Sequence, residues 1–197
     1  MRAASAGFWV KIIDTVFAVA LFLYPLAVYA GLSAWGPRVL VPLLLIMFGA
    51  RILRARPTSR RVFSVTLIIA IVGILLVLAS WMLGKFDLLL WYPVSVSFVL
   101  LLGFGWSLFF PPTIVERIAR LTDPNLPPEA IAYTRNVTRI WCVFFIINGL
   151  IAAATCLHGD LRIWTLYNGA ISYALMGTLM LGEWLVRRRF LGKNKTE

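Results

Sequence analysis

Histidine and cysteine are scarce in this sequence, and their scarcity limits the chemistry that the chain can carry. Its 197 residues include one histidine, His158, and two cysteines, Cys142 and Cys156. No CxxC or Cys/His spacing typical of a metal site occurs. The two cysteines are fourteen positions apart, and on a helix this spacing separates them by about 21 Å, too far for a disulfide. We therefore expect no metal, no cofactor and a buried apolar role for both cysteines.

Acidic residues are also few, at 8 Asp and Glu against 19 Lys and Arg, which gives a net charge of +11. In a soluble protein this excess would suggest nucleic acid as a partner. Here the basic residues stand at the ends of long apolar runs, where they orient membrane helices and meet anionic headgroups. We therefore expect anionic membrane lipids as partners and no nucleic acid.

Long apolar runs are abundant, since 61% of the residues are hydrophobic and the mean hydropathy is +0.88. A run of about 18 or more apolar residues with few charges is typical of a transmembrane helix. We predict an all-α, polytopic membrane protein with a single transmembrane domain over residues 1–197. The six predicted spans cover residues 12–30, 39–53, 62–83, 88–110, 140–157 and 164–185.

The first two runs differ from the others. The first ends at Val28-Tyr29-Ala30, which could pass as the small-residue cleavage site of a signal peptide. The run is longer than a usual signal core, which favours an uncleaved anchor. The second run is the shortest and contains Arg51, whose long side chain can still reach the headgroups.

The distribution of basic residues predicts the orientation of the spans. With six spans, both termini lie on one side of the membrane, together with the linker after the second run, the polar segment 111–139 and the tail 186–197. This side carries 16 of the 19 Lys and Arg residues, and the other side carries Arg38, Lys85 and Arg162. Because basic residues favour the cytoplasmic side, both termini are predicted to be cytoplasmic. The tryptophans, Trp164 among them, fall at the ends of runs, where the membrane interface favours them.

Residues 111–139 form the only long polar segment between two apolar runs. Its first part is predicted to be a short amphipathic helix that lies in the headgroup plane. The polar face of this helix comprises Thr113, Glu116, Arg117 and Arg120, and the apolar face comprises Ile114, Val115, Ile118 and Leu121. Pro127-Pro128 is expected to open a second helix that continues into the fifth run. One stripe along that helix consists of Tyr133, Val137, Trp141, Phe144 and Asn148.

The polar segment offers a candidate site on the cytoplasmic face. Its arginines would hold a phosphate or a carboxylate, and acidic or tyrosine side chains would orient that group. The alternative is a solvated juxtamembrane loop whose arginines hold lipid phosphate and set the topology. The candidate residues for contact with an anion, a lipid or a partner are Glu116, Arg117, Arg120, Glu129, Tyr133, Arg135 and Arg139.

Asn148 stands near the middle of the fifth run. A polar amide inside a membrane needs a hydrogen-bonding partner. The expected partners are Asn168, Ser172 and Tyr173 on the sixth run. Asn148 is therefore interpreted as an interhelical contact rather than as a substrate ligand.

The polar segment also resembles a family of bacterial inner-membrane proteins without assigned chemistry. The genes of this family tend to lie beside acyl carrier protein, acyl ligase and ketosynthase genes of aryl-polyene-type or related fatty-acid-like pathways. The resemblance covers about a fifth of the chain and is carried by Pro112, Glu116-Arg117-Ile118-Ala119-Arg120, Asp123-Pro124, Leu126-Pro127-Pro128-Glu129, Tyr133-Thr134-Arg135, Thr138, Trp141, Phe144-Phe145 and Asn148. It implies a location in the bacterial inner membrane, with acyl carrier protein or cytoplasmic acyl-chain enzymes as partners.

Three functions stay open. The first is an accessory or scaffold protein of a lipid or acyl-chain biosynthesis pathway. The second is a membrane-embedded acyl- or phospholipid-group transferase, with Glu116 or Glu129 as base and an anion clamp made of Arg117, Arg120 and Arg135. The third is a small lipid transporter or flippase, although the predicted spans carry almost no charge at mid-membrane.

No catalytic residue is assigned. Ketosynthase chemistry is rejected because it needs a cysteine nucleophile with histidines, and this chain has a single histidine. His158 and Asp160 stand close together but have no nucleophile beside them in the sequence.

Overall fold

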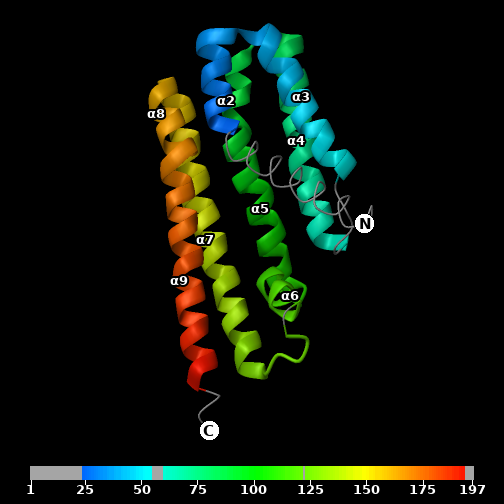
Figure 1. Cartoon of the computed structure of the whole chain (residues 1–197), viewed down its shortest axis with the longest axis vertical. Coiled ribbons are helices and arrows are strands. Elements are labelled where there is room, and N and C mark those ends of the chain that lie inside the picture. The colour runs from blue at the N-terminus through cyan, green and yellow to red at the C-terminus, as the bar shows by residue number, and fades with distance from the viewer. Residues whose placement is uncertain (1–23, 55–59, 122, 194–197) are drawn as a thin grey trace, which may run out of the picture.

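The computed structural model describes residues 24–54, 60–121 and 123–193 (Figure 1). Every regular element in these ranges is a helix, so the all-α prediction is confirmed for them. The elements are α2 (Tyr24–Ala30), η1 (Gly31–Trp35), α3 (Pro37–Arg54), α4 (Arg60–Leu83), η2 (Phe86–Trp91), α5 (Tyr92–Phe109), α6 (Ile114–Arg120), α7 (Pro128–His158), α8 (Leu161–Leu166), η3 (Tyr167–Ile171) and α9 (Ser172–Lys193).

Three helical segments are long and apolar enough to cross a membrane: Phe86–Phe109, Pro128–His158 and Leu161–Val186. They overlap the fourth, fifth and sixth predicted spans. The segments Arg38–Ala50 and Leu67–Leu83 are apolar but shorter, and they overlap the second and third predicted spans. Most of the first predicted span lies outside the described residues. Six spans therefore stay a prediction, and membrane association rests on the three long helices.

The long helices run alternately up and down (Figure 1). Helices α5 and α7 make the most extensive helix–helix contact of the bundle, and the α3–α4 pair packs on α5 through α4. Helix α9 runs along the other side of α7. The first turns of α3 and α8, which include Arg38 and Arg162, and the connection from α4 to η2, which includes Lys85, lie at one end of the bundle, and helix α6 lies at the opposite end.

The chain reverses between α7 and α8 at a turn that the sequence specifies locally. Gly159 follows α7 with φ +78°, a left-handed conformation that glycine adopts without a steric penalty. Asp160 then caps α8, because its carboxylate accepts from the backbone N–H of Arg162 at 2.7 Å and from that of Ile163 at 3.3 Å. This turn brings the sixth apolar run back alongside the fifth.

An aromatic cluster joins α2, α3 and α5 in the core. The ring of Tyr92 lies 4.4 Å from that of Tyr24 and 5.1 Å from that of Phe48, measured between centroids. Tyr24 is buried, and its hydroxyl donates to the carbonyl of Leu89 at 2.9 Å. The short 3₁₀ segment η2 is therefore fixed to α2 directly before α5 begins.

The neighbouring carbonyl of Leu90 receives two further donors. Trp164 donates its indole N–H at 3.0 Å, and the thiol of Cys156 donates at 3.1 Å. Trp164 is completely buried and its N–H is used inside the bundle, while its expected depth at the membrane interface stays a prediction. Cys142 and Cys156 are half-buried free thiols.

Gly73 allows the close packing of α4 on α3. A Cβ atom at this position would lie 2.5 to 2.7 Å from carbons of the Phe48 ring. We expect Gly73→Ala to lower the free energy of unfolding by about 1–3 kcal/mol, because the buried ring has to shift. The matched control is Gly49→Ala on α3, where a Cβ would meet no atom within 4 Å. Equilibrium unfolding in mixed micelles measures both changes, and equal stability of the two variants would contradict the packing.

Candidate functional site

Helix α6 begins where two buried hydroxyl groups fix its first turn. Thr113 accepts from the backbone N–H of Glu116 at 3.3 Å. Ser107, on the last turn of α5, accepts from the N–H of Ile114 at 3.1 Å and donates to the carbonyl of Phe104 at 2.7 Å. Both hydroxyls satisfy polar groups at helix ends that have no partner within their own helix. The start of α6 is therefore attached to the end of α5.

The orientation of α6 differs from that of a simple amphipathic helix with its polar face in solvent. Glu116 and Ala119 are its buried residues, and α6 packs against α7. Ile118 is 52% exposed and Leu121, directly after the helix, is 72% exposed. The helix thus turns its acid towards the protein and part of its apolar face outward. Its place in the headgroup plane stays a prediction, and these outward apolar side chains suit it.

Glu116 is the centre of the contacts that hold α6. Its Oε1 accepts from Arg120 Nη2 at 2.8 Å and from Arg120 Nε at 3.0 Å. The same guanidinium donates to the carbonyl of Pro124 at 3.1 Å. This ion pair therefore ties α6 to the connection that leads into α7. This pairing favours a structural role for the Glu116 carboxylate over a role as a general base.

Two further arginines bind carbonyls of the connection between α5 and α6. Arg117 Nε donates to Pro112 O at 2.8 Å, and Arg135 Nη2 donates to Leu108 O at 3.3 Å. The carbonyl of Leu108 has no donor within its own helix, because the residue four positions on is Pro112, which has no N–H. Two of the three arginines that were predicted to form the anion clamp therefore donate to backbone carbonyls at or just after the end of α5.

The remaining candidates lie along α7. Glu129 is exposed in the first turn, and Arg139 is exposed and donates to Asn136 Oδ1 at 3.0 Å. The hydroxyl of Tyr133 donates to the carbonyl of Glu183 on α9 at 3.4 Å. The structure therefore pairs Glu116 with Arg120 and brings Arg117 and Arg135 to carbonyls at and just after the end of α5, whereas Tyr133 contacts α9 and the side chains of Glu129 and Arg139 are exposed.

A groove between α7 and α9, which we call the α7–α9 groove, lies beside these residues. Its volume is about 710 Å³. The five residues of the predicted stripe along α7 all line it, so the sequence did identify this face. The α9 side contributes Leu175, Thr178, Leu179, Gly182, Glu183 and Val186, and Tyr167 of η3 also lines the groove. Along α7, the polar residues of the lining are Tyr133 and Asn136 at one end and Asn148 at the other, and the residues between them are apolar or aromatic.

Asn148 stands at one end of the groove and makes three side-chain hydrogen bonds. Its Nδ2 donates to Ser97 Oγ on α5 at 3.1 Å. Its Oδ1 accepts from Ser172 Oγ at 2.8 Å and from the Tyr167 hydroxyl at 3.1 Å. Of the three expected partners, Ser172 is one, whereas Asn168 donates instead to Thr155 Oγ1 at 3.2 Å and to the Trp164 carbonyl at 2.9 Å.

Sequence reasoning missed Ser97 and Tyr167 as partners of Asn148. Ser97 lies on α5, and nothing in the local pattern relates it to a residue 51 positions away. Tyr167 belongs to a π-helical turn, in which an extra residue changes which side chains share a helix face. A serine and a tyrosine inside apolar runs were the available signals, because buried hydroxyls in a membrane need partners.

Comparison of the chain with protein-family models, with curated proteins and with solved structures finds no match. The resemblance of the polar segment to a bacterial inner-membrane family therefore stays a prediction, and so do the partners that it implies. The described side chains offer three chemical features: a paired carboxylate on α6, arginines around the end of α5, and an apolar groove with polar ends.

The hydrogen bonds of Asn148 predict the effect of removing its amide. We expect Asn148→Leu to lower the free energy of unfolding by about 1–3 kcal/mol, because Ser97, Tyr167 and Ser172 each lose a partner. Asn136→Leu, on the exposed part of the same helix, is the control and should change it by less than about 0.5 kcal/mol. Unfolding by titration with a denaturing detergent compares the two, and a null effect of the first change would contradict the network.

The contacts of Glu116 predict a second, local effect. Glu116→Gln removes the ion pair with Arg120, whose side chain is partly exposed, so we expect a modest loss of about 1 kcal/mol. Trypsin should then cut after Arg120 faster than in the unaltered protein, because the guanidinium is released. Glu129→Gln, at an exposed position, should leave both the stability and the cleavage rate unchanged. Equal cleavage of the two variants would show that the pair does not hold α6.

Proposed function

We propose that the chain is an accessory protein of a lipid or acyl-chain biosynthesis pathway that holds an acyl chain in the α7–α9 groove. It would cross the bacterial inner membrane six times with both termini in the cytoplasm. The three long apolar helices support a membrane location. The arrangement of the three turns with Arg38, Lys85 and Arg162 at the end opposite to α6 supports this topology.

The observation that carries the proposal is the lining of the groove. Its long middle part is apolar and aromatic. The end nearest the cytoplasmic surface in the proposed topology, which we call its outer end, has Tyr133, Asn136 and Glu183. From Tyr133 to Asn148 the groove follows sixteen residues of α7, whose fifteen helical rises make about 22 Å. One leaflet of hydrocarbon is about 15 Å deep, half of the ~30 Å core. An extended acyl chain therefore fits along it, with a polar head at the outer end.

The surroundings of the outer end suit an anionic head or an acidic carrier. Arg135 and Arg139 are exposed on the same part of α7 as Asn136, and further basic residues belong to the chain's C-terminal tail. Positive charge at the membrane surface attracts anionic lipid and steers acidic proteins to the right face. Acyl carrier protein is acidic, so this end of the groove is where it would deliver or collect a chain.

The two alternatives find less support in the same contacts. A transferase needs a carboxylate that can act as a base on the bound substrate. Of the two predicted bases, Glu116 is buried and paired with Arg120, and Glu129 is exposed but does not line the groove. A flippase needs a polar path for a headgroup through the membrane. The polar residues of the groove stand mainly at its ends, and Thr178 between them donates its hydroxyl to the Ala174 carbonyl of its own helix. This lining offers no continuous polar path and suits an acyl chain that stays in place.

Two glycines of α9 provide a matched test. Neither Gly182 nor Gly177 would bring a Cβ within 4 Å of another atom, but only Gly182 lines the groove. We expect Gly182→Leu to reduce the affinity for cis-parinaric acid at least 10-fold, because the new side chain fills the space that the acyl chain needs. Gly177→Leu should bind as the unaltered protein does. Energy transfer from tryptophan to the bound polyene measures the affinity in nanodiscs.

The same pair tests the biosynthetic role in cells. Lipid extracts of a strain that lacks the gene are compared by mass spectrometry with extracts of strains that express each variant. If the deletion loses an acyl lipid, Gly177→Leu should restore it and Gly182→Leu should not. Restoration by both variants, together with unchanged binding of the fatty acid, would overturn the groove as the site.

A further inference from the structure

A pocket lies between the first turns of α3 and the connection from α4 to η2, at the end of the bundle opposite α6 (Figure 1). Its volume is about 460 Å³. We call it the Arg38 pocket, and its lining residues are Arg38, Val41 and Pro42 of α3, Trp81 of α4 and Phe86 of η2. Arg38 is the one charged side chain among them, and the other four are apolar or aromatic. The pocket therefore offers a cationic group beside an apolar wall.

The turn that ends α4 fixes the aromatic side of this pocket. Gly84 has φ +65° and donates its N–H to the Trp81 carbonyl at 3.3 Å. The N–H of Lys85 donates to the Ser80 carbonyl at 3.1 Å, which completes the Schellman arrangement that closes many helices at a glycine. The buried Ser80 hydroxyl also donates to the Lys85 carbonyl at 2.8 Å. Trp81 and Phe86 are thus held on the two sides of one closed turn.

The guanidinium of Arg38 takes no part in holding the fold. Its side chain is exposed, and it makes no hydrogen bond or ion pair with any other residue that the structure describes, Asp87 of η2 included. By contrast, Arg117 and Arg135 donate to backbone carbonyls. A guanidinium presents a planar set of donors that fits the oxygens of a phosphate. The Arg38 guanidinium can therefore serve a phosphate without breaking a contact of the fold.

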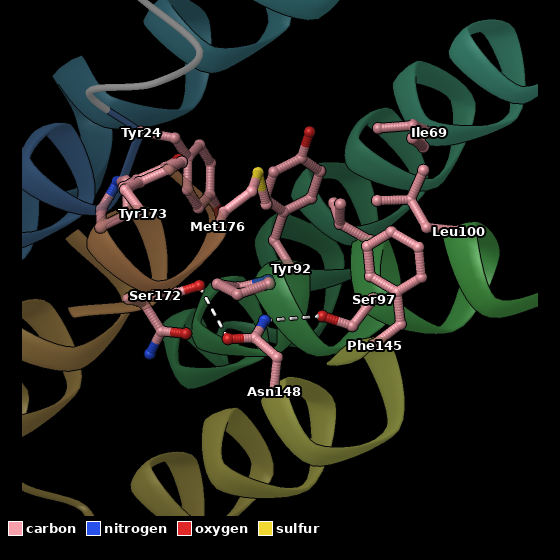
Figure 2. Close-up of a pocket in the computed structure, with 14 residues that line it drawn as sticks. Tyr24, Ile69, Tyr92, Ser97, Leu100, Phe145, Asn148, Ser172, Tyr173 and Met176 are labelled. Atoms are coloured by element: carbon pink, nitrogen blue, oxygen red, sulfur yellow. Dashed lines mark hydrogen bonds between the residues drawn. The ribbon is translucent and has the colours of Figure 1, made fainter. Parts of the chain in front are cut away.

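The cavity among α2, α5, α7 and α9 shows the opposite arrangement (Figure 2). Its volume is about 270 Å³, and no charged side chain of the described residues lines it. Asn148 in its wall is bonded to Ser97 and to Ser172, as the dashed lines show. The Tyr24 hydroxyl in the same wall donates to the Leu89 carbonyl. These polar groups serve the fold, so a ligand with a charged head is expected at the Arg38 pocket instead.

The surface around the Arg38 pocket is suited to lipid. Val39 on α3 and Met82 and Leu83 on α4 are exposed apolar side chains, and Trp81 is 64% exposed. Lys85 beside them is exposed and charged. Apolar side chains, tryptophan and basic residues meet in this way at a membrane surface. A ligand with both a phosphate and an apolar chain would contact the whole pocket, whereas a free phosphate would leave the aromatic wall uncovered.

We propose that the Arg38 pocket binds one phospholipid, whose phosphate oxygens accept from the Arg38 guanidinium and whose acyl chain packs against Trp81 and Pro42. The positive guanidinium complements the phosphate, and the apolar wall complements the chain. In the proposed topology the pocket opens to the periplasmic leaflet. The inference is independent of the proposed function, because the pocket shares no lining residue with the α7–α9 groove.

The test uses the full chain in dodecyl maltoside micelles, which contain no phosphate, and a phosphatidylglycerol with a diazirine in one acyl chain as the probe. After illumination, peptide mass spectrometry locates the label, and we expect saturable labelling of the peptides that contain residues 38–42 and 81–86. One basic side chain at a membrane surface is worth about 5-fold in lipid binding, so Arg38→Gln should reduce this labelling by about that factor. Arg162→Gln removes the same charge from an exposed position outside the pocket and should reduce it by less than about 2-fold.

Competitors added to the unaltered protein keep the test decisive without any variant. Unlabelled phosphatidylglycerol should compete at least about 5-fold better than a diacylglycerol with the same chains, which lacks the phosphate, and glycerol 3-phosphate should not compete. Equal competition by diacylglycerol would overturn the proposal, and so would competition by glycerol 3-phosphate, equal labelling of the two arginine variants or a lack of saturable labelling. Labelling of peptides from α7 and α9 reports the groove separately, so failure at one site is distinguishable from failure at the other.

Discussion

The need to pair every buried polar group inside the protein governs this structure. In an apolar surrounding no water is available to complete a hydrogen bond. The carbonyls of Leu89 and Leu90 therefore draw donors from α2, α7 and α8, and Asn148 draws partners from α5, η3 and α9. These few contacts fix which helices are neighbours, and apolar packing fills the space between them.

The same requirement explains the polar segment. The Leu108 carbonyl near the end of α5 has no N–H donor at Pro112, and Arg135 supplies one, while Arg117 donates to the Pro112 carbonyl in the connection that follows. Ser107 and Thr113 start α6, and Glu116 with Arg120 connects it to the next loop. Charge that looks available in the sequence is thus partly engaged in building the segment. The groove beside it owes its polar outer end to residues further along α7 and α9.

Sequence reasoning reached the helices because apolar runs and helical spacing are local signals. The stripe from Tyr133 to Asn148 was predictable as one face, and it does line one groove. The inward side of α6 was not predictable, because Glu116 is buried by a helix that the local pattern does not include. The contact between Asn148 and Ser97 likewise joins residues far apart in the chain. The sequence predicted features that repeat at helical spacing, and it did not predict contacts between helices that are distant in the chain.

The π-helical turn η3 directly precedes α9. Helix α9 is joined to the core beside this turn by Ser172, and near its other end it meets the Tyr133 hydroxyl through Glu183. Between these points the groove separates it from α7. Turns of this kind frequently stand at functional sites. Helix α9 is thus attached near both ends and stands away from α7 between them, so under the proposed function its distance from α7 sets how thick a chain the groove accepts.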